Sequence, residues 1–119
     1  MSPKVPDAHP PLKHSVYQIL LALGADELHG YGIMQTLAEK TRGRESILPG
    51  TLYASLARMV DEGLVEERDA PEGVTSGGPQ RRYYRRTELG LAVARAESER
   101  LRALLDIAAE QDIVPDASR

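Results

Sequence analysis

The segment from Ile47 to Arg86 constrains the fold more than any other part of this chain. It reads ILPGTLYASLARMVDEGLVEERDAPEGVTSGGPQRRYYRR. The pattern predicts a short amphipathic helix, then a strand, a polar turn rich in Gly and Pro, and a returning strand rich in Tyr and Arg. A helix followed by an arginine-tipped hairpin is the arrangement with which a winged helix-turn-helix meets DNA. The helix enters the major groove and the hairpin lies against the neighbouring backbone.

Length and composition limit the alternatives. The chain has 119 residues, enough for one domain with a real core but not for two. It contains no Phe, Trp or Cys, so the core must consist of Leu, Ile, Val, Ala and Met, with Tyr as the only aromatic type. The absence of Cys excludes disulfides, thiolate nucleophiles and Cys-ligated metals. No apolar run approaches the ~20 residues of a membrane span, and the N-terminus has no signal-peptide pattern. We expect a cytoplasmic protein with no membrane partner.

Apolar residues at helical spacing predict four helices. The first is expected over residues 12–24 and the second over 30–41, the second with an inner face of Tyr31, Met34, Leu37, Ala38 and Thr41. The third opens at Pro49, where the missing N–H of proline costs nothing, and ends before Gly63. The fourth runs from an N-cap at Thr87 to about Glu110.

Strands are expected at residues 64–68 and 82–86, with a very short additional strand at 46–48. Alternation along the returning strand places Arg82 and Tyr84 on one face and Tyr83 and Arg85 on the other. The expected fold class is therefore mostly α with a small antiparallel β wing, a winged helix-turn-helix plus one C-terminal helix. The expected division is a flexible arm at 1–11, a DNA-binding domain at 12–87, a dimerisation helix at 88–111 and a flexible tail at 112–119.

The third helix has a sharp inside-outside division. Its inner stripe is Leu52, Leu56, Met59 and Val60, and its outer face carries Thr51, Tyr53, Ala54, Ser55 and Arg58. Thr hydrogen-bonds bases or phosphates, Ala meets a thymine methyl group, and Arg holds a phosphate, so the outer face suits DNA. The alternative is that Tyr53 packs against the hairpin and Thr51 only caps the helix.

The hairpin adds positive charge to a chain whose net charge is −3. We expect Gly78, Pro79, Arg81 and Arg82 to form the tip that contacts phosphates, while Arg85 and Arg86 can pair with Glu66, Glu67 or Glu88. Residues 61–72 are strongly acidic, so the molecule would carry basic tips on an acidic body. The alternative is that residues 79–86 are an ordinary solvated charge run.

Other chemistry is not supported by the sequence. His9, His14 and His29 are too scattered for a metal site or a catalytic triad, and there is no phosphate-binding glycine loop. We expect His29 to order the turn before the second helix. No enzyme activity, cofactor or metal is expected.

The chain resembles the short form of the PadR family of bacterial transcriptional regulators. The matching motifs are HGYGIMQTL, LPGTLYASLARMVDEGLVE and GGPQRRYYRRTELG, and the similarity covers residues 14–108. The resemblance implies a dimeric winged-helix repressor whose last helix crosses onto the partner. It places Thr51, Tyr53 and Arg58 on the DNA-facing helix. It places Gly78, Pro79, Arg81 and Arg82 in the wing. Arg86 stands where family members usually have Leu, so it is expected either to snorkel or to pair with an acid.

The last helix carries more apolar positions than a small domain needs. We expect Leu101, Leu104, Leu105 and Ile107 to form a dimer interface, which would match a palindromic operator in double-stranded DNA. The family resemblance also implies a small aromatic effector near that interface. The residues expected to line its pocket are Val16, Tyr17, Leu20, Leu101 and Leu105. The alternative function is a winged-helix module that binds protein and not DNA.

Overall fold

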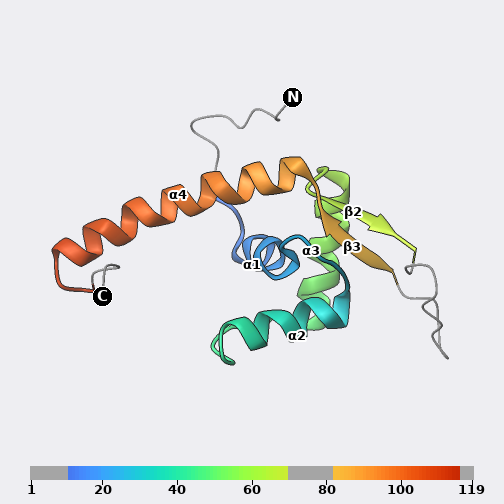
Figure 1. Ribbon diagram of the computed structural model, residues 1–119, viewed down its shortest axis with the longest axis horizontal. Helices are drawn as coiled ribbons and strands as arrows, with labels where there is room; N and C mark the ends of the chain where they lie inside the picture. The colour runs from blue at the N-terminus through green and yellow to red at the C-terminus, as the bar shows by residue number, and fades with distance from the viewer. Residues whose placement is uncertain (1–10, 70–81, 116–119) are drawn as a thin grey trace.

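The computed structural model describes residues 11–69 and 82–115. Its elements are α1 (His14–Leu23), β1 (Glu27–His29), α2 (Gly30–Lys40), α3 (Pro49–Asp61), β2 (Val65–Arg68), β3 (Tyr83–Arg86) and α4 (Glu88–Glu110). Figure 1 shows α1, α2 and α3 as the body, the strands projecting from one side, and α4 running over the body and past it on the other side. This is the mostly helical fold with a small antiparallel wing that the sequence predicts.

The sheet has three strands in the order β1-β3-β2, and both pairings are antiparallel. The short third strand was expected at residues 46–48, which is wrong: the structure has it at Glu27–His29, paired with β3. Ile47 is buried, as its apolar character suggests, but its neighbourhood is an irregular approach to Pro49, the first residue of α3. A three-residue strand such as β1 exists because β3 offers it an edge, and sequence periodicity does not detect that.

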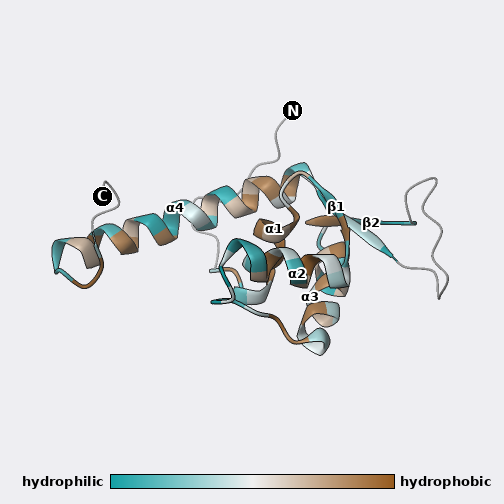
Figure 2. Ribbon diagram, turned by 60° about the horizontal axis from the view of Figure 1, so that its bottom comes forward, coloured by the Kyte–Doolittle hydropathy of each residue, from teal (hydrophilic) through white to brown (hydrophobic). Residues whose placement is uncertain are grey.

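The core is built around α1. The fully buried large side chains come mainly from α1 and α3, with one each from α2 and β2. They are Ile19, Leu20, Leu23, Ile33, Leu52, Leu56, Met59 and Val65. Figure 2 shows α1 as the most apolar element, lying among the other helices. The inner stripe predicted for α3 is therefore confirmed for Leu52, Leu56 and Met59, and Val60 packs partly buried against the core.

The face predicted for α2 is partly wrong. Leu37 is buried as expected, but Ile33 fills the other central position and Tyr31 is 58% exposed. Two residues along a helix turn the side chain by about 200°, so Ile33 inside places Tyr31 outside. The tyrosine therefore lies on the surface at the N-terminal end of α2.

The turn between α2 and α3 is fastened to α1 through Glu45. Its Oε1 lies 2.6 Å from His14 Nε2 and accepts a hydrogen bond of 2.8 Å from the amide of the buried Gln18. These two hydrogen bonds, that of His14 first, hold the pKa of Glu45 below its ordinary value. The contact fixes where α3 begins relative to α1.

The junction between the wing and α4 is closed by Thr87. Its hydroxyl accepts from the backbone N–H of Gly90 at 3.0 Å, which confirms the predicted N-cap, and donates to the carbonyl of Gly63 at 2.6 Å. One side chain thus satisfies an orphan donor of α4 and ties the helix to the turn after α3.

We expect Thr87→Ala to lower the free energy of unfolding by about 1–2 kcal/mol, because both hydrogen bonds are lost. Chemical denaturation of the two proteins at equal concentration measures the difference. Thr87→Ser keeps the hydroxyl and serves as the control; if it is as destabilised as the alanine variant, the cap is not the cause.

Candidate nucleic-acid interface

Most of the outer face predicted for α3 is accessible among the described residues, the exception being Ser55, which is half-buried and shares a hydrogen bond of 2.8 Å with Ser15 of α1. Thr51, Tyr53, Ala54 and Arg58 are all exposed, on the side of the helix opposite the buried stripe. Within residues 11–69 and 82–115, the ion pair of Arg58 is a long contact of 3.7 Å with Glu62, one turn further along. The face therefore offers a hydroxyl, a phenol, a methyl group and a loosely held guanidinium to a partner.

Tyr53 is both exposed and supported. Half of the residue is accessible (51%), and its ring lies over the first residue of α2. A Cβ atom placed at Gly30 would come within 2.5 Å of the Tyr53 hydroxyl, so the ring needs a glycine there. The alternative drawn from the sequence placed this ring against the hairpin, whereas the structure gives it a contact with α2 and leaves half of the residue accessible.

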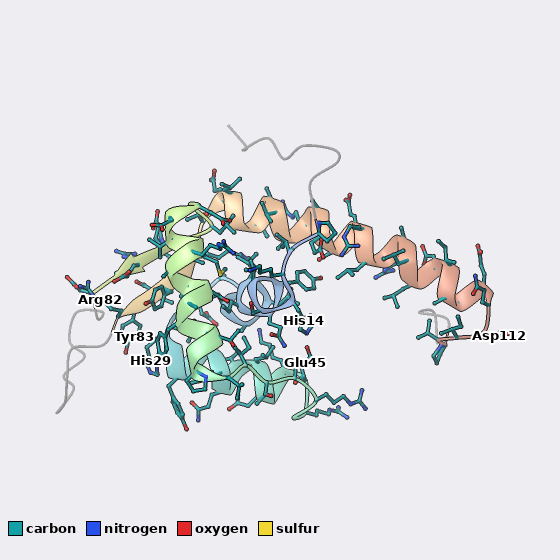
Figure 3. The ribbon with its side chains drawn as sticks, turned by 180° about the vertical axis from the view of Figure 1, so that it is seen from behind. His14, His29, Glu45, Arg82, Tyr83 and Asp112 are labelled. Atoms are coloured by element: carbon teal, nitrogen blue, oxygen red, sulfur yellow. The ribbon has the colours of Figure 1, made fainter. Side chains whose placement is uncertain are left out.

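His29 joins the wing to α2. Its Nδ1 accepts from the backbone N–H of Gly32 at 3.0 Å, which confirms that it orders this turn. Its ring meets Tyr83 of β3 edge-on, with centroids 5.3 Å apart, and stacks at 6.4 Å on Tyr31. Figure 3 shows His29 and Tyr83 together beside α3, at the end of the molecule where the wing leaves the body.

The wing strands have the predicted faces. Tyr84 is buried and Arg85 exposed, while Arg82 precedes β3 and is exposed. Arg85 pairs with Glu66 directly across the sheet at 2.9 Å, as one of the sequence alternatives required. Arg82 contacts Glu67. The expected tip residues Gly78, Pro79 and Arg81 lie outside the described residues.

Among the described residues Arg86 has no acidic partner, so of its two expected roles the structure bears out snorkelling and not the ion pair. Its guanidinium donates to the backbone carbonyl of Leu20 at 3.3 Å, in the last turn of α1. Its methylene stem lies beside Gly90, because a Cβ built there would be 3.0 Å from Arg86 Cγ. The stem fills apolar space, as snorkelling predicts, and the cation meets the negative end of a helix.

The predicted interface and effector residues separate into two groups. Leu104, Leu105 and Ile107 are about half exposed on the outer part of α4, and Leu101 and Tyr17 are half-buried. Val16 and Leu20 belong to the protomer's own core. The five residues outside the core therefore offer surface to a partner or an effector, and the two core residues do not.

One buried charge was not foreseen. Glu97 is 3% exposed on the inner face of α4 and accepts two hydrogen bonds from Arg100, at 2.9 and 2.6 Å. Hydrogen bonding to this carboxylate raises the pKa of Arg100. The spacing of three residues was the available signal, because it allows an ion pair along one helix face. No three His, Asp or Glu side chains in the described ranges approach closely enough to hold a metal.

Three core helices, an exposed polar face on the third and a three-stranded antiparallel sheet beside it define a winged helix-turn-helix protein. Residues 19–96 match the model of the transcriptional regulator PadR-like family, and the chain belongs to that family. Among the described residues, no helix is long and apolar enough to cross a membrane.

Solved structures of similar fold include several members of this family. A PadR family transcription regulator from Clostridium difficile R20291 is 26% identical with a TM-score of 0.66, covering 82% of this chain and 97% of that one. The regulator from Eggerthella lenta is 27% identical with a TM-score of 0.67, covering 81% and 79%. Bacillus subtilis PadR, solved in complex with operator DNA, is 25% identical with a TM-score of 0.59, covering 70% and 45%.

One curated protein is also similar to this chain in sequence. Uncharacterized protein X from Lysinibacillus sphaericus is 35% identical over 74 residues, which span 62% of this chain and 65% of that protein.

Proposed function

We propose that this protein is a sequence-specific, DNA-binding transcriptional repressor that binds a palindromic operator as a homodimer. The observation that carries the proposal is the exposed face of α3, with Thr51, Tyr53 and Ala54 at its N-terminal half, beside a wing that bears Arg82. The N-terminal part of a recognition helix is the part that reaches base edges. The complex of the B. subtilis relative with operator DNA supports the same use of the fold.

The parts have distinct roles in this proposal. Tyr53 and Thr51 contact base edges, Ala54 meets a thymine methyl group, and Arg58 and Arg82 bind phosphates. The ring of Tyr53 is held over Gly30, so it is presented to DNA in a restricted orientation that lowers the entropy cost of binding. Phosphate contacts fix the register, and base contacts supply the sequence preference.

The dimer and the effector belong to the same proposal. The exposed apolar residues on the outer part of α4 support an interface between two copies of the chain. An effector site between α1 and the partner's α4 would use Tyr17, Leu101 and Leu105, which are the predicted lining residues that have accessible surface.

Selection of bound duplexes from a random pool should return a palindrome with half-sites about one helical turn apart. On that sequence, Tyr53→Ala should weaken binding by about 1–3 kcal/mol. Arg82→Ala and Arg81→Ala should each weaken all duplexes similarly and flatten the salt dependence by about one unit. Fluorescence anisotropy over a salt series measures both quantities. Arg102→Ala, an exposed arginine on the outer part of α4, is the matched control.

The outcomes separate the two candidate functions. A triple Tyr53, Arg81 and Arg82 alanine variant that keeps wild-type affinity and salt slope would rule out this DNA interface. A wild-type chain that enriches no duplex would favour the alternative, a winged-helix module that binds protein.

A further inference from the structure

The arginines of the wing already have partners in the free protein. In its described part, residues 65–69 and 82–86, there are four arginines. Arg68 lies 3.4 Å from Glu27, and Arg85 lies 2.9 Å from Glu66. Arg82 contacts two carboxylates, Glu67 and Asp69, and Arg86 contacts a backbone carbonyl. The wing is therefore not simply a basic tip. Arg85 on β3 and Arg82, the residue before β3, each have an acidic partner on β2.

Arg82 lies at the outer end of the sheet. It precedes β3 on the face that carries Tyr84, whereas Arg85 is on the opposite face. Tyr84 is buried. Its pKa is raised above the ordinary value, mainly by burial and then by the charges of Glu67 and the neighbouring Tyr53. Glu67 and Arg82 therefore lie on the sheet face that adjoins α3. Figure 3 shows Arg82 at the outer end of the sheet on that side of the molecule.

The contacts of Arg82 use the atoms that a phosphate would use. Its Nε lies 3.1 Å from Glu67 Oε1, and an Nη atom donates to Asp69 Oδ1 at 3.2 Å. Arginine binds phosphate with the same fork of N–H groups. The side chains are well exposed, at 61% for Arg82 and 75% for Asp69, so water and ions have free access to the pairs. A phosphate can therefore replace the carboxylates, but only in competition with them.

We propose that Glu67 and Asp69 compete with DNA phosphate for Arg82 and thereby lower the affinity of the wing for the DNA backbone. The inference rests on the proposed function. Exposed ion pairs are individually weak, so the competition reduces affinity by a modest factor and does not block binding. A phosphate contact carries no sequence information, so the reduction is the same on every duplex. Binding then depends more heavily on the base contacts of α3.

The test is the double variant Glu67→Gln with Asp69→Asn, which removes both charges and keeps the side-chain shapes. Its affinity for the selected operator and for a scrambled duplex should each rise by about three- to tenfold. Its salt dependence should steepen by less than one unit, because in the wild type the carboxylates that lose Arg82 take up cations and offset part of the release from phosphate. Fluorescence anisotropy with both duplexes over a salt series gives the two numbers.

A matched control removes two acids elsewhere. Glu39→Gln with Asp112→Asn makes the same change in net charge on α2 and after α4, and Asp112 lies at the opposite end of the molecule from Arg82 (Figure 3). Its effect on affinity should be clearly smaller. The decisive measurement is coupling: Arg82→Ala should cost about three- to tenfold more in the Glu67→Gln, Asp69→Asn background than in the wild type.

Each result decides the proposal. Tighter binding that disappears when Arg82 is replaced supports it. Unchanged affinity, weaker binding, or a gain that persists without Arg82 overturns it and leaves the proposed function standing. A wild-type protein that binds no duplex overturns the proposed function, and this inference with it.

Discussion

Replacing Gly90 with alanine should destabilise this protein by about 3 kcal/mol, a large share of the roughly 5–15 kcal/mol that holds a small domain together. A Cβ atom at this position would collide with the backbone carbonyl oxygen of Leu64 and would lie 3.0 Å from Arg86 Cγ and 3.2 Å from Leu20 Cδ2. The carbonyl cannot give way cheaply, because it accepts the hydrogen bond from the backbone N–H of Thr87. The expected cost exceeds the ~1 kcal/mol that alanine gains over glycine inside a helix.

Gly50→Ala is the matched control, since it makes the same substitution in a helix where nothing lies within 4 Å of the new atom. It should leave the protein as stable as wild type or slightly more so. Urea unfolding at one protein concentration compares the three chains through their midpoints and slopes. If Gly90→Ala unfolds at the wild-type midpoint, α4 does not pack as closely on the end of α3 and β2 as the structure has it.

Local patterns predicted most of this fold because the residues that set each element lie close together in the sequence. The capping roles of His29 and Thr87 need only a side chain three residues before a free N–H, and both are confirmed. The alternation of Tyr83 to Arg85 follows from strand geometry alone. The inner stripe of α3 follows from helical spacing.

The predictions from sequence fail where contacts between distant segments determine the structure. The strand β1 forms because β3 pairs with it, and the partners are separated by more than fifty residues of chain, as in Leu28 with Tyr84. Arg86 reaches the carbonyl of Leu20, which no spacing rule connects to it. The burial of Glu97 depends on how α4 crosses α1. Periodicity carries no information about such contacts.

The candidate site also combines features that local sequence predicts with features that depend on contacts between distant segments. Helical spacing predicts the exposure of Thr51, Tyr53, Ala54 and Arg58 on α3. The pairing of Arg82 with Glu67 and Asp69 instead depends on how the two wing strands are aligned. The sequence shows a basic segment and an acidic one. Only the alignment of the strands shows that these acids pair with Arg82 and Arg85, which are the contacts on which the proposed competition with phosphate rests.

The inner face of α4 continues beyond the body it packs on. Gly90, Ala94 and Glu97 are buried, and the same face continues at helical spacing through Leu101 to Leu104 and Leu105. The last two are 53% and 52% exposed, on a helix of 23 residues that extends past α1 (Figure 1). An exposed apolar stripe that continues a buried face needs a cover, and the proposed second copy of the chain, related by a two-fold axis, would supply it.

We therefore expect Leu104→Glu with Leu105→Glu to abolish the proposed homodimer. Losing the burial of two leucines removes about 3–6 kcal/mol, and the buried carboxylates add a further cost, so the dimer Kd should rise by roughly 100-fold or more. Both positions are exposed in the protomer, so its own fold should survive, and light scattering should report the mass of one chain, 13.1 kDa. Operator affinity should fall with it, because the two half-sites are then bound separately. Arg95→Gln with Ala103→Glu makes the same change in net charge at exposed positions away from the inner face, and should remain dimeric. A Leu104, Leu105 variant that keeps twice the chain mass and binds the operator as wild type does would place the interface on another surface.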